Sequence, residues 1–526
     1  MASPTPAPLP VGLGVEIDRA VRLTDEGHVL VGGSPPRALR LPPEGVSAVI
    51  RWLSGADPGH LGERRLARVL VQAGLAHPRP APVPPGEGVQ LALTGRAAPA
   101  ELERALDRIG REHPDLRPVV VGATGATARV ARRRGLRVVE GPSGGAGARA
   151  AALGACDAGI VALLETGAEP EPGWLDVALG HFADPGVAAV LPRLLPVRRR
   201  CGHGAMAAAA LHAQTVDRGA DPAPVLPWGR ARRGLGHPAP PGEHASADPL
   251  APVRALLVRR GAADLDPSLG AGAEAEMLWR LAEEGWSVRY EPRSKVRAPM
   301  PTGLGSYLRA RFEAGAAAGP LARRHGRRAV GPELSLPGAL GLGLVLAGRP
   351  VAGLAVCAVG GAMTARTMTS GAAVPLADTV RPAAADLVHT ARTGSRAART
   401  VWWPAVAAVA VGGAVSRVGR SGGVRVPGRW ALAAGAVLTV PHLVSWRRRH
   451  GAALVGPIAW TGMSAAGDAA RSLGTWWGAA RARSLAPLLP RRRPPVSATS
   501  LVSSQLERGS VGQVRKSAPA AVVSGG

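Results

Sequence analysis

The sequence is poor in cysteine, lysine and large aromatic residues. Its 526 residues include 3 Cys, 2 Phe and 2 Tyr, and Lys295 and Lys516 are its lysines. Cys156, Cys201 and Cys357 stand apart from one another, which predicts neither a disulfide framework nor a zinc site and is compatible with a reducing compartment. The 13 histidines show no paired ligand spacing, so a histidine metal site is not expected either.

Positive charge is therefore almost entirely arginine, as in chains from very GC-rich genomes. The net charge is +27, and residues 331–526 hold 22 Arg and Lys against 5 Asp and Glu. Basic charge placed between apolar stretches is typical of cytoplasm-facing juxtamembrane segments. The chain has no basic face with interleaved aromatics, so nucleic acid is not an expected partner. The first residues lack the basic start and apolar core of a secretory signal, and we expect no leader.

Residues 1–80 favour a small α+β module. The pattern predicts strands between Val15 and Leu23, a hairpin over 29–41, and amphipathic helices over 46–53 and 63–75. Two helices with a hairpin are the composition of a winged-helix module. A proline-rich linker over 81–88 separates it from the rest of the chain.

Strand-like and helix-like stretches alternate over residues 89–330. The predicted strands are 89–95, 118–125, 136–141, 159–167 and 188–195, and the predicted helices are 97–113, 144–156 and 175–183. This rhythm indicates an α/β domain with a mainly parallel sheet flanked by helices, whose ligands sit at the carboxyl ends of the strands. Gly95, Gly122 and Gly167 fall at such ends. Arg259 and Arg260 end a further apolar strand, where they either face a diphosphate or are simply solvated.

The chain changes character after residue 330. Apolar runs over 335–348, 351–365, 401–415, 430–446 and 452–463 alternate with arginine-rich connectors such as 392–399. Most runs are shorter than the ~18–20 residues that span a bilayer, so membrane hairpins and a soluble helical tail both stay open. The alternation of apolar runs with arginines favours membrane association. We therefore expect an apolar helical membrane-associated region over 331–490 and disorder over 491–526.

The stretch from Gly272 to Pro292 predicts an acidic turn, a short helix and a strand. Glu274 and Glu276 open the helix, and Met277 and Leu281 lie on its apolar face. Helix N-termini favour negative charge. The two glutamates are thus either working carboxylates or a complement to the helix dipole.

Seven stretches share one order with a known family. They are 18–23, 32–41, 169–194, 217–230, 254–262, 276–292 and 307–325. Together they resemble the mycofactocin-system glycosyltransferases of glycosyltransferase family 2, over residues 9–350. The resemblance implies a GT-A-like fold and an inverting transfer of a hexose, expected to be glucose, from a UDP-sugar. It also implies a peptide-derived redox cofactor as acceptor, a divalent metal (Mg²⁺ or Mn²⁺), and work at the cytoplasmic face of the cell membrane.

The same resemblance assigns the site residues. Glu274 falls at the position of the general base, and Glu276 belongs to the same acidic turn. Glu165 falls at the metal-binding motif, where hard oxygen ligands are wanted, and is therefore the expected metal ligand. Arg96 and Arg149, together with Glu165, are expected to bind the nucleotide sugar.

Several acids of the family pattern are replaced. Gly122 and Ala123 stand where the family has an acidic pair, and Gly167 stands where it has the second metal-binding aspartate. Glutamate in place of the base aspartate moves the carboxylate by roughly 1 Å, a displacement that can cost ~100-fold. Two hypotheses follow: a working membrane-associated glucosyltransferase, or a catalytically inactive, glycosyltransferase-like binding or scaffold protein at the membrane in the same pathway.

Overall fold

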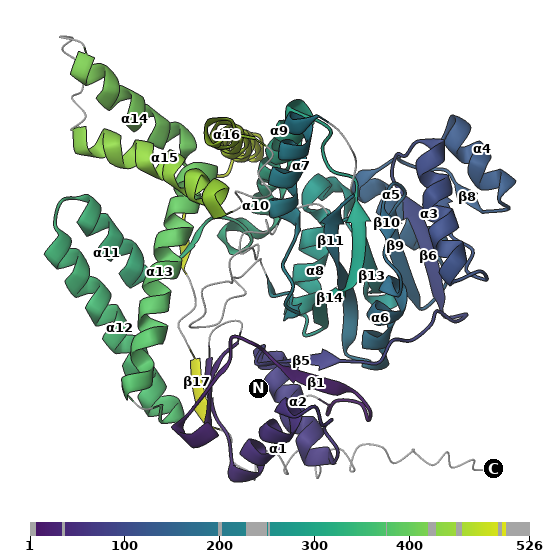
Figure 1. The fold of residues 1–526 in the computed structure, drawn as a ribbon, viewed down its shortest axis with the longest axis horizontal. Coiled ribbons are helices and arrows are strands. Elements are labelled where there is room, and N and C mark those ends of the chain that lie inside the picture. The colour runs from purple at the N-terminus through teal and green to yellow at the C-terminus, as the bar shows by residue number, and fades with distance from the viewer. Residues whose placement is uncertain are drawn as a thin grey trace, which may run out of the picture.

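The structure, a computed structural model, describes most of the chain. The described residues are 7–33, 37–197, 202–227, 250, 253–374, 376–418, 428–448, 455–492 and 497–500. They form an N-terminal module, a sheet-centred domain and a helical region (Figure 1).

The sheet-centred domain alternates strands and helices as the sequence predicts. Its strands are β6 (Val89–Thr94), β7 (Val119–Val121), β8 (Val138–Val139), β9 (Ile160–Glu165), β10 (Glu169–Pro170), β11 (Val187–Pro196), β12 (Ala223–Pro224), β13 (Ala255–Arg259) and β14 (Ser287–Ala298). Its helices are α3 (Pro99–Glu112), α4 (Gly125–Arg133), α5 (Gly145–Ala155), α6 (Trp174–Gly180), α7 (His203–Val216), α8 (Ala273–Glu283), α9 (Leu304–Ala316) and α10 (Ala318–His325). The sequence pattern predicted no helix at α4.

One sheet carries this domain, in the order β10-β14-β11-β13-β9-β6-β7-β8, with β12 on β14. Pairs among β8, β7, β6 and β9 are parallel, as is β11 with β14. Two apolar clusters cover its two faces, so the prediction of a parallel-rich α/β sheet with helices on both faces is confirmed.

The exception is β13, which runs antiparallel to both β9 and β11. Arg259 at its end therefore pairs with Ile160, at the beginning of β9. The alternative that placed Arg259 at a diphosphate is wrong, because the strand direction puts it at the opposite edge of the sheet from the carboxyl end of β9. Its guanidinium donates instead to the carbonyl oxygen of Val187 at 3.2 Å and lies over the Phe182 ring.

The N-terminal module combines two helices with short strands. These are β1 (Gly14–Ile17), β2 (Arg22–Thr24), β3 (Val29–Gly32), β4 (Arg37–Arg40), α1 (Pro43–Leu53), α2 (Leu61–Ala73) and β5 (Ala76–Arg79). β1 pairs with β5, and β2, β3 and β4 form a meander, so the predicted hairpin and both helices are present. The winged-helix assignment stays a prediction.

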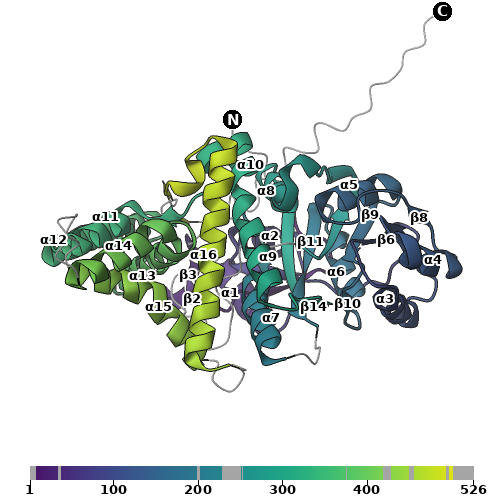
Figure 2. The same cartoon turned by 90° about the horizontal axis from the view of Figure 1, so that it is seen from above.

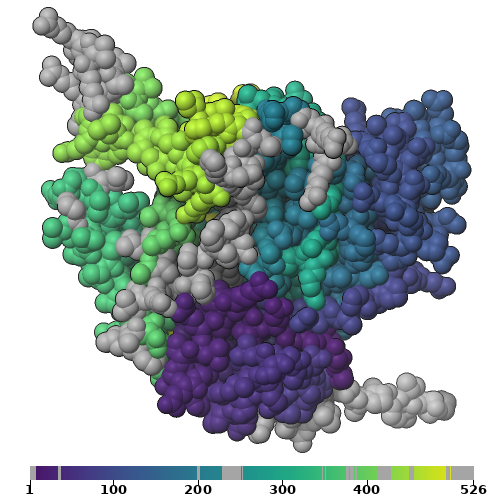
Figure 3. Space-filling model, viewed as in Figure 1, coloured from purple at the N-terminus to yellow at the C-terminus, as the bar shows by residue number. Residues whose placement is uncertain are grey.

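The proline-rich linker packs on α6. The N–H of Val83 donates to the carbonyl oxygen of Asp176 at 2.9 Å. A Cβ built on Gly180 would lie 2.2 Å from the carbonyl oxygen of Ala81, so glycine permits this close approach. The module consequently lies directly against the sheet-centred domain (Figure 3).

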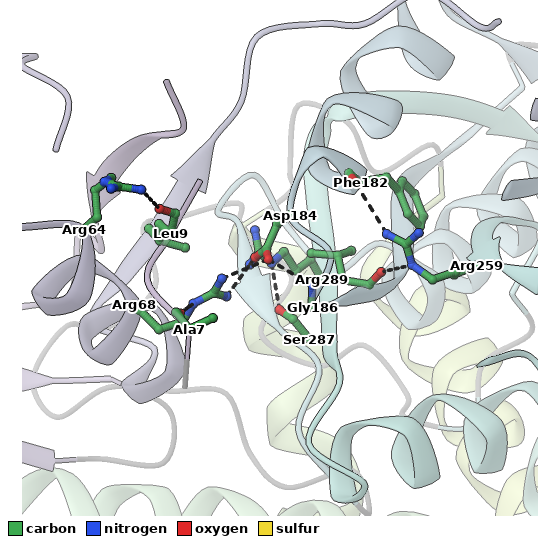
Figure 4. A network of polar contacts seen from close by, with 11 residues as sticks. Ala7, Leu9, Arg64, Arg68, Phe182, Asp184, Gly186, Arg259, Ser287 and Arg289 are labelled. Carbon is green, nitrogen blue, oxygen red and sulfur yellow. Dashed lines mark hydrogen bonds and ion pairs between the residues drawn. The ribbon is translucent and has the colours of Figure 1, made fainter. Parts of the chain in front are cut away.

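A buried carboxylate fastens the module to the domain (Figure 4). Asp184 accepts two hydrogen bonds from Arg68 of α2, at 2.8 and 2.9 Å, and one from Arg289 of β14 at 2.9 Å. Burial raises the pKa of Asp184, but the hydrogen bonds and charges of the two arginines prevail and lower it overall. Burial also lowers the pKa of Arg289 to about 10.

A second buried carboxylate, Glu291 of β14, lies near α6. It is bound by the His181 ring at 2.8 Å and by the Arg293 guanidinium at 2.9 and 3.0 Å. Burial raises its pKa, but these partners outweigh burial and lower the pKa to about 2.

The helical region contains β15 (Glu333–Leu334), α11 (Leu336–Leu346), α12 (Pro350–Ala372), α13 (Leu376–Thr400), α14 (Trp403–Val418), α15 (Gly428–Arg448), α16 (Pro457–Ala482) and β16 (Arg491–Arg492). Each predicted apolar run lies in a helix over most of its described residues. The arginine-rich stretch 392–399, predicted as a connector, is instead part of α13. Figure 1 shows α11 with α12, and α14 with α15, as two hairpins pointing away from the sheet.

Helix α16 joins this region to the sheet-centred domain (Figure 2). It packs on α9 through glycines: a Cβ on Gly315 would lie 2.1 Å from the carbonyl oxygen of Arg471, and one on Gly474 would lie 2.1 Å from that of Phe312. Asp468 on α16 also binds Arg311 of α9 at 3.3 Å. The helical region is thus fastened to the domain by close backbone packing and a buried ion pair.

The end of the chain was predicted to be disordered from residue 491. Arg491–Arg492 instead pairs with β15, and β17 (Ser497–Ser500) pairs in parallel with β4, extending the sheet of the N-terminal module. Residues 493–496 and 501–526 lie outside the described residues. The difference arises because β4 offers an unpaired edge, which a short polar strand can complete whatever its own composition.

Candidate active site

Glu165 ends β9 and is held by an arginine from the neighbouring strand. Its two carboxylate oxygens each lie 2.5 Å from Nη1 of Arg254, and its own N–H donates to the carbonyl oxygen of Arg254 at 2.9 Å. The antiparallel register fixes this meeting, because Ala255 pairs with Leu164. Both side chains are about one-fifth exposed, at 20% and 19%. Sequence reasoning missed Arg254, although its position just before an apolar strand was a usable signal.

Loops at the carboxyl ends of β6 and β8 meet beside Glu165. A Cβ on Gly95 would lie 3.4 Å from Cγ of Glu165, and one on Gly144 would lie 3.9 Å from the Cα of Gly95. Arg96, which is exposed, donates from Nε to the Ser143 hydroxyl at 3.0 Å. The predicted donor-binding residues Arg96 and Glu165 therefore belong to one loop cluster at this edge of the sheet.

Arg149 and Glu274 form a buried ion pair between α5 and α8. Nη1 of Arg149 donates to Oε1 of Glu274, and the two residues are 8% and 3% exposed. The structure thus joins a predicted donor-binding residue to the predicted base. A carboxylate bound this way has one oxygen already occupied by a cation, and that oxygen becomes available to another group only when the arginine shifts to another anion.

Glu276, the other acid of the turn, has different partners. It is 1% exposed, and its Oε1 lies 3.1 Å from Nε2 of His325, 3.7 Å from Nε of Arg280 and 3.9 Å from Nε of Arg324. These contacts tie α8 to α10. The catalytic assignment of Glu276 stays a prediction, and its contacts give it a structural role.

Gly122 cannot be exchanged for an acid without moving the backbone. Its φ is +71°, and a Cβ there would lie 2.2 Å from the carbonyl oxygen of Pro142. Positive φ is strained for residues with a side chain. The glycine is therefore built into this loop, while the neighbouring Ala123 is only half-buried.

Four buried polar atoms, on Thr166, Arg254 and His212, have no hydrogen-bond partner among the described residues. They are Oγ1 of Thr166, Nε of Arg254 and both ring nitrogens of His212 on α7. Burial, with the charges of Arg254 and Arg311, lowers the pKa of His212 to about 3, so its ring is neutral near pH 7. Buried polar groups are normally paired, so these four atoms depart from the usual pattern.

A sequence relative spans nearly the whole chain. The pre-mycofactocin glycosyltransferase of Mycobacterium tuberculosis, in strains CDC 1551 / Oshkosh and ATCC 25618 / H37Rv, is 30% identical over 517 residues. The match covers 92% of this chain and 99% of the relative. No family model matches the chain.

Solved structures are more distant. The mannosyltransferase PcManGT from Pyrobaculum calidifontis, in complex with GDP-Man and Mn²⁺, is 18% identical with a TM-score of 0.38, covering 76% of this chain and 89% of that chain. Glucosyl-3-phosphoglycerate synthase from Mycobacterium tuberculosis, in complex with Mg²⁺ and UDP, is 16% identical with a TM-score of 0.29, covering 45% and 79%.

Proposed function

The chain belongs to the pre-mycofactocin glycosyltransferase family, and we propose that it moves a hexose from a UDP-sugar to a peptide-derived redox cofactor of the mycofactocin type. The observation that carries this proposal is the 30% identity over 92% of the chain, which includes the N-terminal module and the helical region. Glucose is the proposed hexose, and inversion at the anomeric carbon the proposed outcome.

An inverting transfer is a single displacement. The acceptor hydroxyl attacks the anomeric carbon, the bond from that carbon to the diphosphate breaks, and the nucleoside diphosphate leaves with the electron pair. A base takes the hydroxyl proton. Glu274 is our candidate for this base, because it is a buried carboxylate at the first turn of a packed helix.

The Arg149–Glu274 pair gives the donor a way to prepare the base. A diphosphate carries more negative charge than a carboxylate and presents several oxygens to a guanidinium. Donor bound beside α5 would draw Arg149 toward its phosphates and free Oε1 of Glu274 for the acceptor proton. Arg96, on the neighbouring loop, supplies a further positive charge to the donor.

The resemblance also implies a divalent metal at Glu165. Such cations take six or more oxygen ligands, several of them usually carboxylates or phosphates. Glu165 has both oxygens on Arg254, Gly167 offers no side chain, and the part of the chain that the structure describes has no group of three or more His, Cys, Asp or Glu arranged to hold a metal. The residues present do not fit a resident metal, so we derive no step through one.

We place the enzyme at the cytoplasmic face of the membrane. Among the described helices, α12 contains the one stretch long and apolar enough to cross a bilayer, Val351–Ala372. Of the 18 residues that make this stretch apolar, 11% are buried. Leu354 and Met363 on α12 are 63% and 65% exposed. An exposed apolar surface of this length favours contact with lipid. In vesicle flotation, Leu354→Asp with Met363→Asp should leave the protein unbound, whereas Ile50→Asp, at a 54% exposed site on α1, should float as wild type does.

A second candidate function is a binding or scaffold protein that has lost catalysis. The replaced acids and the arginine-bound Glu165 and Glu274 favour it. In this form the chain would hold the peptide-derived acceptor or a partner enzyme of the pathway at the membrane, without transferring sugar.

A transfer assay distinguishes the glycosyltransferase function from the binding-protein function. It uses purified protein, labelled UDP-glucose, the peptide-derived acceptor and Mn²⁺. We expect labelled product from wild type, a loss of about 100-fold or more in Glu274→Ala, and little change in the control Glu284→Gln, just beyond the other end of α8. Equal transfer by Glu274→Ala and wild type would remove Glu274 as the base. No transfer and no UDP binding by wild type would leave the binding-protein function.

A further inference from the structure

The site differs most clearly from a metal-dependent one because the guanidinium of Arg254 is bound to the carboxylate of Glu165. Nη1 of Arg254 lies 2.5 Å from both carboxylate oxygens of Glu165, and the main-chain carbonyl of Arg254 accepts a hydrogen bond from the N–H of Glu165. The carboxylate that would bind a cation thus already binds one, and this cation is part of the chain.

Arg254 has donor capacity left over. Its Nε is buried and has no partner among the described residues, although Nη1 is engaged by Glu165. Two further side chains have buried polar atoms without a partner among the described residues: Thr166, which follows Glu165 in the chain, and His212, whose ring is influenced by the charge of Arg254. His212 is 2% exposed and Thr166 is 1% exposed. A neutral imidazole and a hydroxyl both donate hydrogen bonds to an anion.

We propose that Arg254 takes the place of the divalent cation, so that the diphosphate of the nucleotide donor binds here to a guanidinium and needs no metal. This inference rests on the proposed function. Glu165 then acts as a positioning residue that orients Arg254. Thr166 and His212 supply hydrogen bonds to the diphosphate, and the fixed positive charge stabilises the negative charge that develops as the diphosphate leaves.

The chemistry of arginine suits this task. Its charge is retained at any physiological pH, and its planar fork presents donors to two phosphate oxygens at once. A metal would contribute more charge at one point, but it needs several carboxylates arranged together, and the described residues include no group of three or more His, Cys, Asp or Glu that could hold one. The antiparallel direction of β13 is what brings Arg254 to the carboxyl end of β9.

Isothermal titration of the full-length protein with UDP tests the inference without relying on turnover. We expect the dissociation constant in EDTA to lie within about threefold of that in Mn²⁺. Arg254→Ala should weaken UDP binding by about 10- to 100-fold, the usual range for a lost hydrogen bond to a charged group. Arg254→Lys keeps the charge and loses the planar fork of the guanidinium, so its affinity for UDP should lie between those of wild type and Arg254→Ala.

Arg259→Ala is the matched control, because it removes an arginine from the other end of the same strand. It should bind UDP as wild type does. Circular dichroism and a thermal melt of each variant establish that it is folded, and Arg254→Lys provides the comparison if Arg254→Ala does not fold.

Two outcomes would overturn the inference and leave the proposed function standing: UDP binding that requires Mn²⁺, or unchanged affinity in both Arg254 variants. Saturable Mn²⁺ binding that is lost in Glu165→Gln would likewise restore Glu165 as a metal ligand. Absence of UDP binding by wild type, with and without Mn²⁺, would instead defeat the inference and the proposed function together.

Discussion

Replacing Asp184 by asparagine should strongly destabilise the protein. The carboxylate is 0% exposed, and the side chains of its partners Arg68 and Arg289 are 8% and 5% exposed. Removing one partner of a buried ion pair costs about 3–5 kcal/mol, because the remaining charge is left uncompensated. Here two guanidiniums lose their carboxylate, so we expect a loss at the upper end of that range.

Urea unfolding at neutral pH measures this loss as a shift of the midpoint. The matched control is Asp107→Asn, whose partner Arg134 lies 2.9 Å away, with both side chains about half exposed at 54% and 48%. A surface pair of this kind contributes about 0–1 kcal/mol. If Asp184→Asn loses no more stability than this control, the contacts among Arg68, Asp184 and Arg289 do not fasten the N-terminal module to the domain.

A triple variant separates unpaired charge from lost packing. Arg68→Met, Asp184→Leu and Arg289→Met together remove all three charges while keeping most of the volume. Replacing a whole buried ionic cluster by apolar groups is often neutral or stabilising. We therefore expect the triple variant to recover most of the stability lost in Asp184→Asn. A triple variant as unstable as the single one would refute the argument from unpaired charge.

Three further predictions concern packing, loop geometry and acid stability. Gly315→Ala should cost about 1–3 kcal/mol in thermal unfolding, because its methyl meets the backbone of α16, whereas Gly462→Ala, with open space around it, should be neutral or stabilising. Gly122→Asp should give misfolded protein, whereas Ala123→Asp should fold. Titration of Ala123→Asp with UDP then measures whether an acid at this position strengthens UDP binding. Glu291 has its pKa lowered to about 2 in the folded state against ~4.3 when unfolded, so it contributes stability above that unfolded value and loses it as the pH falls toward 2. Glu291→Gln should therefore remove about 3 kcal/mol of the stability difference between pH 6 and pH 2.

The alternation of apolar strands with amphipathic helices was enough to predict the sheet. β6, β9 and β11 are mainly apolar runs, as expected of strands covered on both faces, and their observed ends differ from the predicted ones by at most two residues. Gly95 and Gly122 marked strand ends correctly. Local pattern carries this information because each strand buries its own side chains.

Strand direction and side-chain partners depend on the whole fold and could not be predicted. A short apolar run has the same pattern whether it is parallel or antiparallel, so the sequence pointed to Arg259 and not to Arg254 before the register of β13 was known. In the same way, Arg149 and Glu274 are 125 residues apart in sequence, and nothing local to either indicates that they meet. The helix α13 was missed because its arginines resemble those of a connector.

The acids that the site lacks and the arginines that it keeps have one electrostatic explanation. Around a divalent metal, carboxylates are needed to balance the charge of the cation, and the diphosphate completes its coordination. When a guanidinium replaces the metal, the local positive charge falls from two to one, and each additional carboxylate would repel the diphosphate. Gly167 in place of the second metal-binding acid then favours donor binding, provided that Arg254 is the cation. Glu165 survives because it holds Arg254 in position, and Glu274 is compatible with the donor because Arg149 balances it until the diphosphate is bound.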